Sequence, residues 1–172
     1  MIQTLRPAVL ALLGGAALLA GCNQAPDDAA PTPALTTPAP RTADAAGNPL
    51  EAGSWSIGEN ANGASAVFVS PAGEPLFRMV CRRADRALML TRSGVPAETK
   101  TYRVSAGGLV ADVEMTPAAG GTAEVEAVVD PGQPILAAFA DPAATIRISA
   151  SAVPELHLPS QTGTSRVVQA CS

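Results

Sequence analysis

The sequence has 172 residues, a length that suits one domain with tails, and its 11 Lys+Arg and 15 Asp+Glu give a formal net charge of −4. This balance excludes a broadly basic nucleic-acid-binding face, and a single histidine excludes any multi-histidine metal site. Aromatic residues make up only 3% of the chain and much of the 47% apolar fraction is alanine, so the core must be light and aliphatic.

Residues 1–21 are typical of a secretory signal peptide. Arg6 and the amino terminus form a short positive region, and residues 8–20 are all apolar or glycine. A helix of that length rises roughly 20 Å, short of the roughly 30 Å hydrocarbon core of a bilayer. The segment is therefore predicted to be a cleaved signal and not a permanent membrane span.

The run Leu19-Ala20-Gly21-Cys22 ends this segment and resembles the lipobox of bacterial lipoproteins. The resemblance implies cleavage before Cys22, a diacylglycerol on its sulfur and a further acyl chain, such as palmitate, on its amine. Two or three chains anchor a protein stably where one does not. Asn23, in place of an aspartate after the cysteine, implies sorting to the outer membrane, facing the periplasm.

Residues 22–49 are predicted to be the lipidated cysteine and a disordered tether. Proline and alanine dominate this stretch, and Leu35 is its only large apolar residue before the domain, so it has nothing with which to build a core. Residues 50–172 are predicted to form a single β-rich domain.

From Leu50 onward the apolar residues alternate with polar ones, which is typical of strands with one buried face. Gly- and Pro-rich turns separate the runs, so we expect an antiparallel β-sandwich or barrel. The expected strands lie near 54–57, 65–70, 77–82, 87–92, 100–105, 109–115, 122–129, 145–149 and 153–158.

Two segments break this period and are predicted to contain short helices. In 134–141, Ile135, Leu136 and Phe139 share one helical face, and Pro142 stops the helix. In 160–171, Ser160 suits an N-cap, but a final strand fits this segment almost as well.

Once lipidation removes Cys22 from the count, Cys81 and Cys171 remain as an even pair in an oxidising compartment. A disulfide between them is the favoured prediction, and two separate thiols are the alternative.

The residues offer little catalytic chemistry. Glu155 and His157 lie two apart on one strand face, where an exposed polar pair is the favoured interpretation and a catalytic base the alternative. No Gly-x-Ser-x-Gly elbow or Ser-x-x-Lys motif occurs. We therefore expect neither an enzyme nor a cofactor or metal.

Two charged groups are candidate contacts. The first group consists of arginines: Arg78 and Arg82 share a strand face, Arg83 and Arg86 follow in a turn, and Arg92 lies further along the chain. These arginines indicate either a solvated hairpin or a contact with an anion, such as a lipid headgroup or envelope polysaccharide.

The second group is an acidic hairpin. If strands 109–115 and 122–129 pair so that Val113 meets Val125, then Glu114 faces Glu124 and Asp112 faces Glu126. Four carboxylates on one face indicate simple solvation, neighbouring arginines, a hard cation or a basic partner.

Several segments also resemble a group of small Gram-negative envelope proteins with no known activity. The resembling residues are Trp55, 75–82, 88–92, 156–160 and 166–171. The resemblance supports the Cys81–Cys171 pair and a helical excursion before strand 145–150.

The expected function is that of a non-enzymatic envelope lipoprotein that binds or supports a protein or polysaccharide partner. The alternative is an inhibitor of a cell-wall hydrolase, by analogy with C-type lysozyme inhibitors, which are small lipid-anchored β-barrels with a disulfide.

Overall fold

The computed structural model describes residues 41–120 and 123–172, so the predicted signal peptide, Cys22 and residues 23–40 lie outside the described residues. The described residues form nine strands and two short helices. The strands are β1 (Ser54–Asn60), β2 (Gly63–Val69), β3 (Pro75–Arg82), β4 (Ala87–Ser93), β5 (Lys100–Ala106), β6 (Leu109–Pro117), β7 (Glu124–Val129), β8 (Thr145–Ala150) and β9 (Val153–Pro159). Each of the nine expected strands is present, which confirms a mainly β fold.

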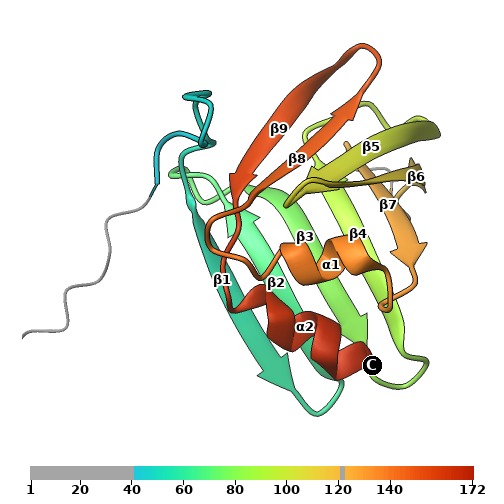
Figure 1. Ribbon diagram of the computed structural model, residues 1–172. Helices are drawn as coiled ribbons and strands as arrows, with labels where there is room; N and C mark the ends of the chain where they lie inside the picture. The colour runs from blue at the N-terminus through green and yellow to red at the C-terminus, as the bar shows by residue number, and fades with distance from the viewer. Residues whose placement is uncertain (1–40, 121–122) are drawn as a thin grey trace, which may run out of the picture. The chain divides into compact units, whose positions relative to one another are not determined.

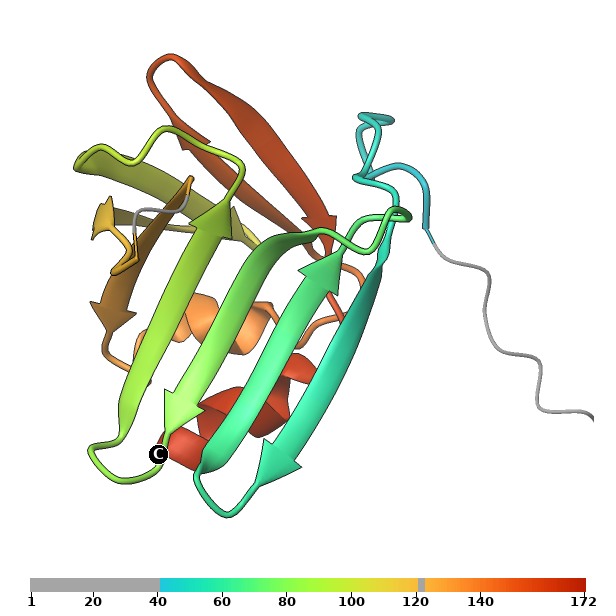
Figure 2. The same ribbon diagram turned by 180° about the vertical axis from the view of Figure 1, so that it is seen from behind.

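The strands form one antiparallel sheet in the order β1-β2-β3-β4-β7-β6-β5-β8-β9. This sheet curls into a half-barrel, as Figures 1 and 2 show from opposite sides. Buried and exposed residues alternate along most strands, as in β3, where Phe77, Met79 and Cys81 point inward. The period of two read from the sequence therefore describes the concave and convex faces of the sheet.

The curl is centred on β6. Residues 109–115 of β6 pair with β5, whereas only Thr116 and Pro117 pair with β7. The two halves of the sheet are therefore joined through the end of one strand, and they diverge beyond it.

Two helices pack against the concave face (Figure 1). Helix α1 (Pro134–Ala138) starts at the expected proline and ends before residue 141, because Phe139 already caps it. The segment 160–171, for which the sequence allowed a helix or a strand, contains helix α2 (Thr164–Cys171). The N-cap of this helix is Gly163 and not the expected Ser160. Thr164 donates a hydrogen bond from its hydroxyl to the Phe139 carbonyl at 2.8 Å, which joins the two helices.

The core contains one aromatic layer. Trp55 packs edge-on against Phe68 and Phe77, with ring centroids 5.5 and 6.3 Å apart, and Phe77 packs in the same way against Phe139 at 6.5 Å. Edge-to-face pairs of this kind stabilise a fold beyond the area they bury. The Trp55 indole N–H also donates to the Pro159 carbonyl at 2.7 Å, so the first and last strands of the sheet are linked.

A disulfide joins Cys81 in β3 to Cys171, the last residue of α2, with the two Cα atoms 5.6 Å apart. The two cysteines that the sequence pairs are thus bonded, and the bond fixes the C-terminal end of α2 against the sheet.

Reduction of this disulfide should lower the melting temperature of the protein. The bond closes a loop of 90 residues, and loop entropy predicts a stabilisation of roughly 4–5 kcal/mol for a loop of this size. For a domain of this length that corresponds to a drop of more than about 10 °C. Differential scanning calorimetry with and without reductant measures the drop, and a Cys81→Ser/Cys171→Ser chain, which should show no reductant effect, is the control. An unchanged melting temperature on reduction would contradict the prediction.

Candidate functional site

The His157–Glu155 pair lies on the outward face of β9. The imidazole Nε2 and the carboxylate Oε2 are 3.2 Å apart, and Arg147 on β8 is the cross-strand neighbour of His157. In the part of the chain that the structure describes, no three His, Cys, Asp or Glu side chains come together as a metal site would require. Within the same residues, no helix has the length and apolarity needed to cross a membrane.

The predicted register of the acidic hairpin is wrong. Val125 pairs with Pro117 and Glu126 with Thr116, four residues further along β6 than expected. The reason is that β5 and β7 compete to pair with β6. Residues 109–115 of β6 pair with β5, so Val113 pairs with Tyr102 and not with Val125. A shift of four residues keeps every side chain on its expected face, because the strand period is two.

This register separates the four carboxylates. Asp112 faces Arg103, with the Arg103 Nε 3.6 Å from its carboxylate, and Glu114 faces Thr101. On the other half of the sheet, Glu126 pairs with Thr91 and Thr116, while Glu124 accepts a hydrogen bond from the Ser93 hydroxyl at 2.7 Å. The described residues therefore contain no facing carboxylate pairs at this hairpin.

The arginines form two groups. Arg78 lies in the middle of β3 on the convex face, where its guanidinium is 3.4 Å from the Glu124 carboxylate. Arg82, Arg83 and Arg86 lie together at the turn from β3 to β4, and only Arg82 forms a carboxylate ion pair within the described residues, with Asp85 at 2.9 Å. Arg83 donates to the Ala61 carbonyl in the neighbouring β1–β2 turn.

Arg92 is not part of this surface. It points into the core with 6% of its area exposed, and its Nη1 donates to the carbonyls of Leu76 and Ser93 at 3.2 and 2.6 Å. Burial lowers the pKa of its guanidinium, and nearby Tyr102 and Glu51 oppose this shift. The sequence carries a signal for its position, since Leu88, Leu90 and Arg92 alternate along one face of β4.

Helix α2 brings one more arginine to the β3–β4 turn. Arg83 and Arg166 line the same hollow of about 370 Å³, together with Glu59, Gln169 and Ala170. The Arg166 guanidinium is 3.7 Å from the Glu59 carboxylate, and both side chains are more than half exposed. We call Arg82, Arg83, Arg86 and Arg166 the basic end of the domain.

The disulfide sets the geometry of the basic end. Arg82 and Arg83 directly follow Cys81 in β3, and Arg166 lies little more than one helical turn before Cys171 in α2. One covalent bond therefore holds arginines that are 83 positions apart in the sequence at the rim of one hollow. Sequence spacing alone did not identify Arg166.

Residues 41–49, which the composition assigns to the tether, are attached to the domain in the structure. Arg41 donates to the carbonyls of Ala143 and Ala144, and Asp44 forms an ion pair with Arg147. The Asp44 carboxylate also accepts hydrogen bonds from the backbone of Ala46 and Asn48 and from the Asn48 side chain, which makes a compact turn. We call residues 41–49 the strap.

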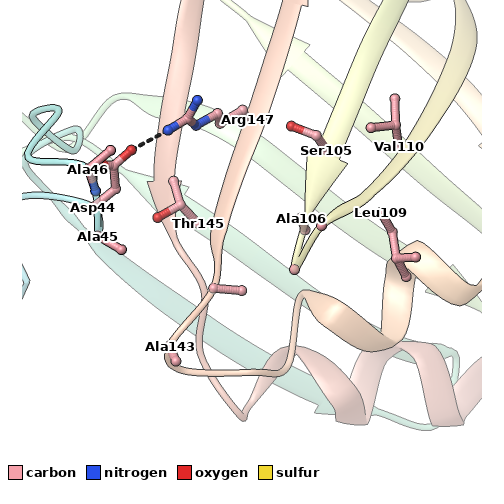
Figure 3. A pocket seen from close by; sticks show the side chains of 13 residues that line it. Asp44, Ala45, Ala46, Ser105, Ala106, Leu109, Val110, Ala143, Thr145 and Arg147 are labelled. Atoms are coloured by element: carbon pink, nitrogen blue, oxygen red, sulfur yellow. Dashed lines mark hydrogen bonds and ion pairs between the residues drawn. The ribbon is translucent and has the colours of Figure 1, made fainter.

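The strap forms one wall of an open groove of about 350 Å³ (Figure 3). Asp44 and Arg147 lie at one side of the groove, and Leu109 and Val110 from the start of β6 lie at the other. Leu109 and Val110 are exposed, and the one buried carboxylate among the described lining residues, that of Asp44, is already bonded to Arg147, Ala46 and Asn48. None of the buried polar atoms that lack a hydrogen-bond partner belongs to a residue lining the groove. The basic end is therefore the stronger candidate site.

The chain has a distant structural similarity to one solved protein. No family model and no curated protein matches the chain. The crystal structure of invasion associated protein B from Bartonella henselae aligns with 20% sequence identity and a TM-score of 0.44, covering 70% of this chain and 92% of that one. A similarity at this level transfers no functional residue.

The strap ion pair should make stability depend on pH at acid values. Hydrogen bonds from Asn48, with help from Ala46 and Arg147, lower the pKa of Asp44 well below its ordinary value of 3.8. A lowered folded-state pKa means that the stabilisation is complete above about pH 4 and is lost as the pH falls through the folded-state value. Asp44→Asn should therefore melt below the parent at pH 6, and the difference should shrink toward pH 2. A difference that stayed constant between pH 6 and pH 2 would contradict this. The matched control is Asp112→Asn, which removes an exposed carboxylate on β6 that also faces an arginine, Arg103.

Proposed function

We propose that this chain is a lipid-anchored envelope protein whose β domain is a non-enzymatic module that binds an anionic envelope polymer through the basic end. The observation that carries the proposal is the hollow lined by both Arg83 and Arg166, beside Arg82 and Arg86. Guanidinium groups suit phosphate and carboxylate oxygens because they present several N–H donors in one plane.

The orientation of the domain supports a partner other than the bilayer that holds the anchor. The strap leads into β1 at Ser54, whereas the basic end adjoins the opposite end of that strand, where Asn60 pairs with Gly63 and Gly63 with Arg82. Chain that leaves the domain at residue 41 therefore starts from the end away from the arginines. An anionic polysaccharide fits this placement better than the headgroups of the same membrane.

The anchor itself is tested by Cys22→Ser. This substitution should leave an uncleaved precursor that takes up no labelled fatty acid, because the acyl chains are attached to the Cys22 sulfur and amine. Metabolic labelling with palmitate and gel mobility measure the outcome. Cys81→Ser, at a cysteine outside the lipobox, is the control and should keep the label. Label on the Cys22→Ser chain would overturn the lipoprotein assignment.

The anion site is tested by Arg83→Gln/Arg166→Gln. This chain should bind polyphosphate and polygalacturonate at least about tenfold more weakly than the parent, because two guanidinium contacts at the same hollow are removed. Both affinities should also fall as salt rises. Titration calorimetry with the two probes distinguishes phosphate from carboxylate recognition. Arg103→Gln, an exposed arginine beside Asp112, is the matched control and should change little; equal losses in the two variants would contradict a local site.

The hydrolase-inhibitor alternative stays a prediction. The acidic hairpin, which would suit a basic partner, has no facing carboxylate pairs, because the β6–β7 register separates Asp112 and Glu114 from Glu124 and Glu126. A lysozyme activity assay distinguishes the two hypotheses: inhibition that survives Arg83→Gln/Arg166→Gln would favour the inhibitor.

A further inference from the structure

The convex face of β2, β3, β4 and β7 carries apolar side chains that do not reach the core. Helix α2 packs on the other face of β2, β3 and β4. No described element packs on the convex face, which Figure 2 shows in front. The register places outward residues Val67 in β2, Val80 in β3, Met89 in β4 and Val128 in β7. Val128 is 65% exposed, the most exposed large apolar side chain among the described residues.

These residues form ordered rows across the strands. Val80 pairs with Met89 and Met89 with Val128, so one row is apolar from β3 to β7. In the next outward row Arg78 pairs with Thr91 and Thr91 with Glu126. The arginine thus lies on β3, the carboxylate on β7, and neutral residues lie on β4 between them.

This arrangement is self-complementary. If the face is turned over about an axis along β4, the position of β3 falls on that of β7. Arg78 then faces Glu126, Val80 faces Val128, and Met89 faces its own copy. Sheets that pack face to face are about 10 Å apart, a distance that long outward side chains such as Met and Arg can span.

We propose that two copies of this chain dimerise through this face, related by a twofold axis along β4. Such an interface is isologous, because each contact occurs twice, once from each copy. Arg78 keeps its contact with Glu124 and still has 38% of its side chain exposed, so it can meet a second carboxylate. The apolar row supplies the buried centre, and the charged row gives the orientation.

A second copy fits this face better than an anionic lipid surface. A bilayer carries negative charge throughout, so it attracts Arg78 but repels Glu126 on the same face. The same surface turned over provides each charge with its opposite. The axis along β4 also places both straps at one end of the dimer and both basic ends at the other, so two anchors could enter one membrane.

Cysteine cross-linking of the full-length chain in cell envelopes tests the proposal. Met89→Cys lies on the axis and should form a disulfide dimer of twice the chain mass on a non-reducing gel after mild oxidation. Val110→Cys is the matched control: its valine is 56% exposed and outward on β6, away from the face, and the variant should stay monomeric. An absence of Met89→Cys dimers, equal dimer in the control, or a cross-link to a protein of another mass would overturn the proposal.

A charge experiment separates this pairing from a loss of folding. Copies of Met89→Glu should not co-purify with one another in non-ionic detergent, because two carboxylates would meet on the axis. Copies of Met89→Lys should behave in the same way. A tagged Met89→Glu chain should retain an untagged Met89→Lys chain, because the charges then attract. Co-purification that is equal in all three combinations would show that this face is not the interface.

Discussion

The Cys81–Cys171 disulfide is the constraint on which the position of α2 and the geometry of the basic end depend. The core has few aromatic residues, and its helices are short, with α2 offering only Thr164, Val167 and Cys171 as buried side chains. A helix of that length contributes little stability by itself. The covalent bond to β3 holds it in place, and with it the arginine that completes the basic end.

The sequence predicts the strands well because burial in a sheet is a local property. Alternating side chains identify the inward face of β3 and β6 without any knowledge of their neighbours. Strand pairing is a non-local property. The polarity pattern allows Val113 to pair with either Val125 or Tyr102. Only the complete fold determines that this part of β6 pairs with β5. Hence the prediction of faces succeeds where the prediction of the register fails.

The candidate site divides in the same way. Arg82, Arg83 and Arg86 are neighbours in the sequence, so their cluster is visible in it. Arg166 joins them only through the folding of α2 back onto the sheet. The strap is a second case in which the sequence does not predict long-range contacts. Its proline-rich composition indicates a tether, yet an aspartate turn and two long-range arginine contacts attach residues 41–49 to the domain.

The strap has a mechanical consequence. A pull on the chain from its N-terminal side would reach the Arg41 and Asp44 contacts before it reached β1, and because these contacts lie at successive positions of the chain they would open one after another. Sequential peeling needs less force than shearing a whole strand from a sheet. Release of the nine strap residues would lengthen the connection by about 30 Å while the β-sheet stays intact. With the proposed lipid anchor at Cys22, the domain would then move away from the membrane under tension and return when the ion pair re-forms, so the strap would serve as an extensible link.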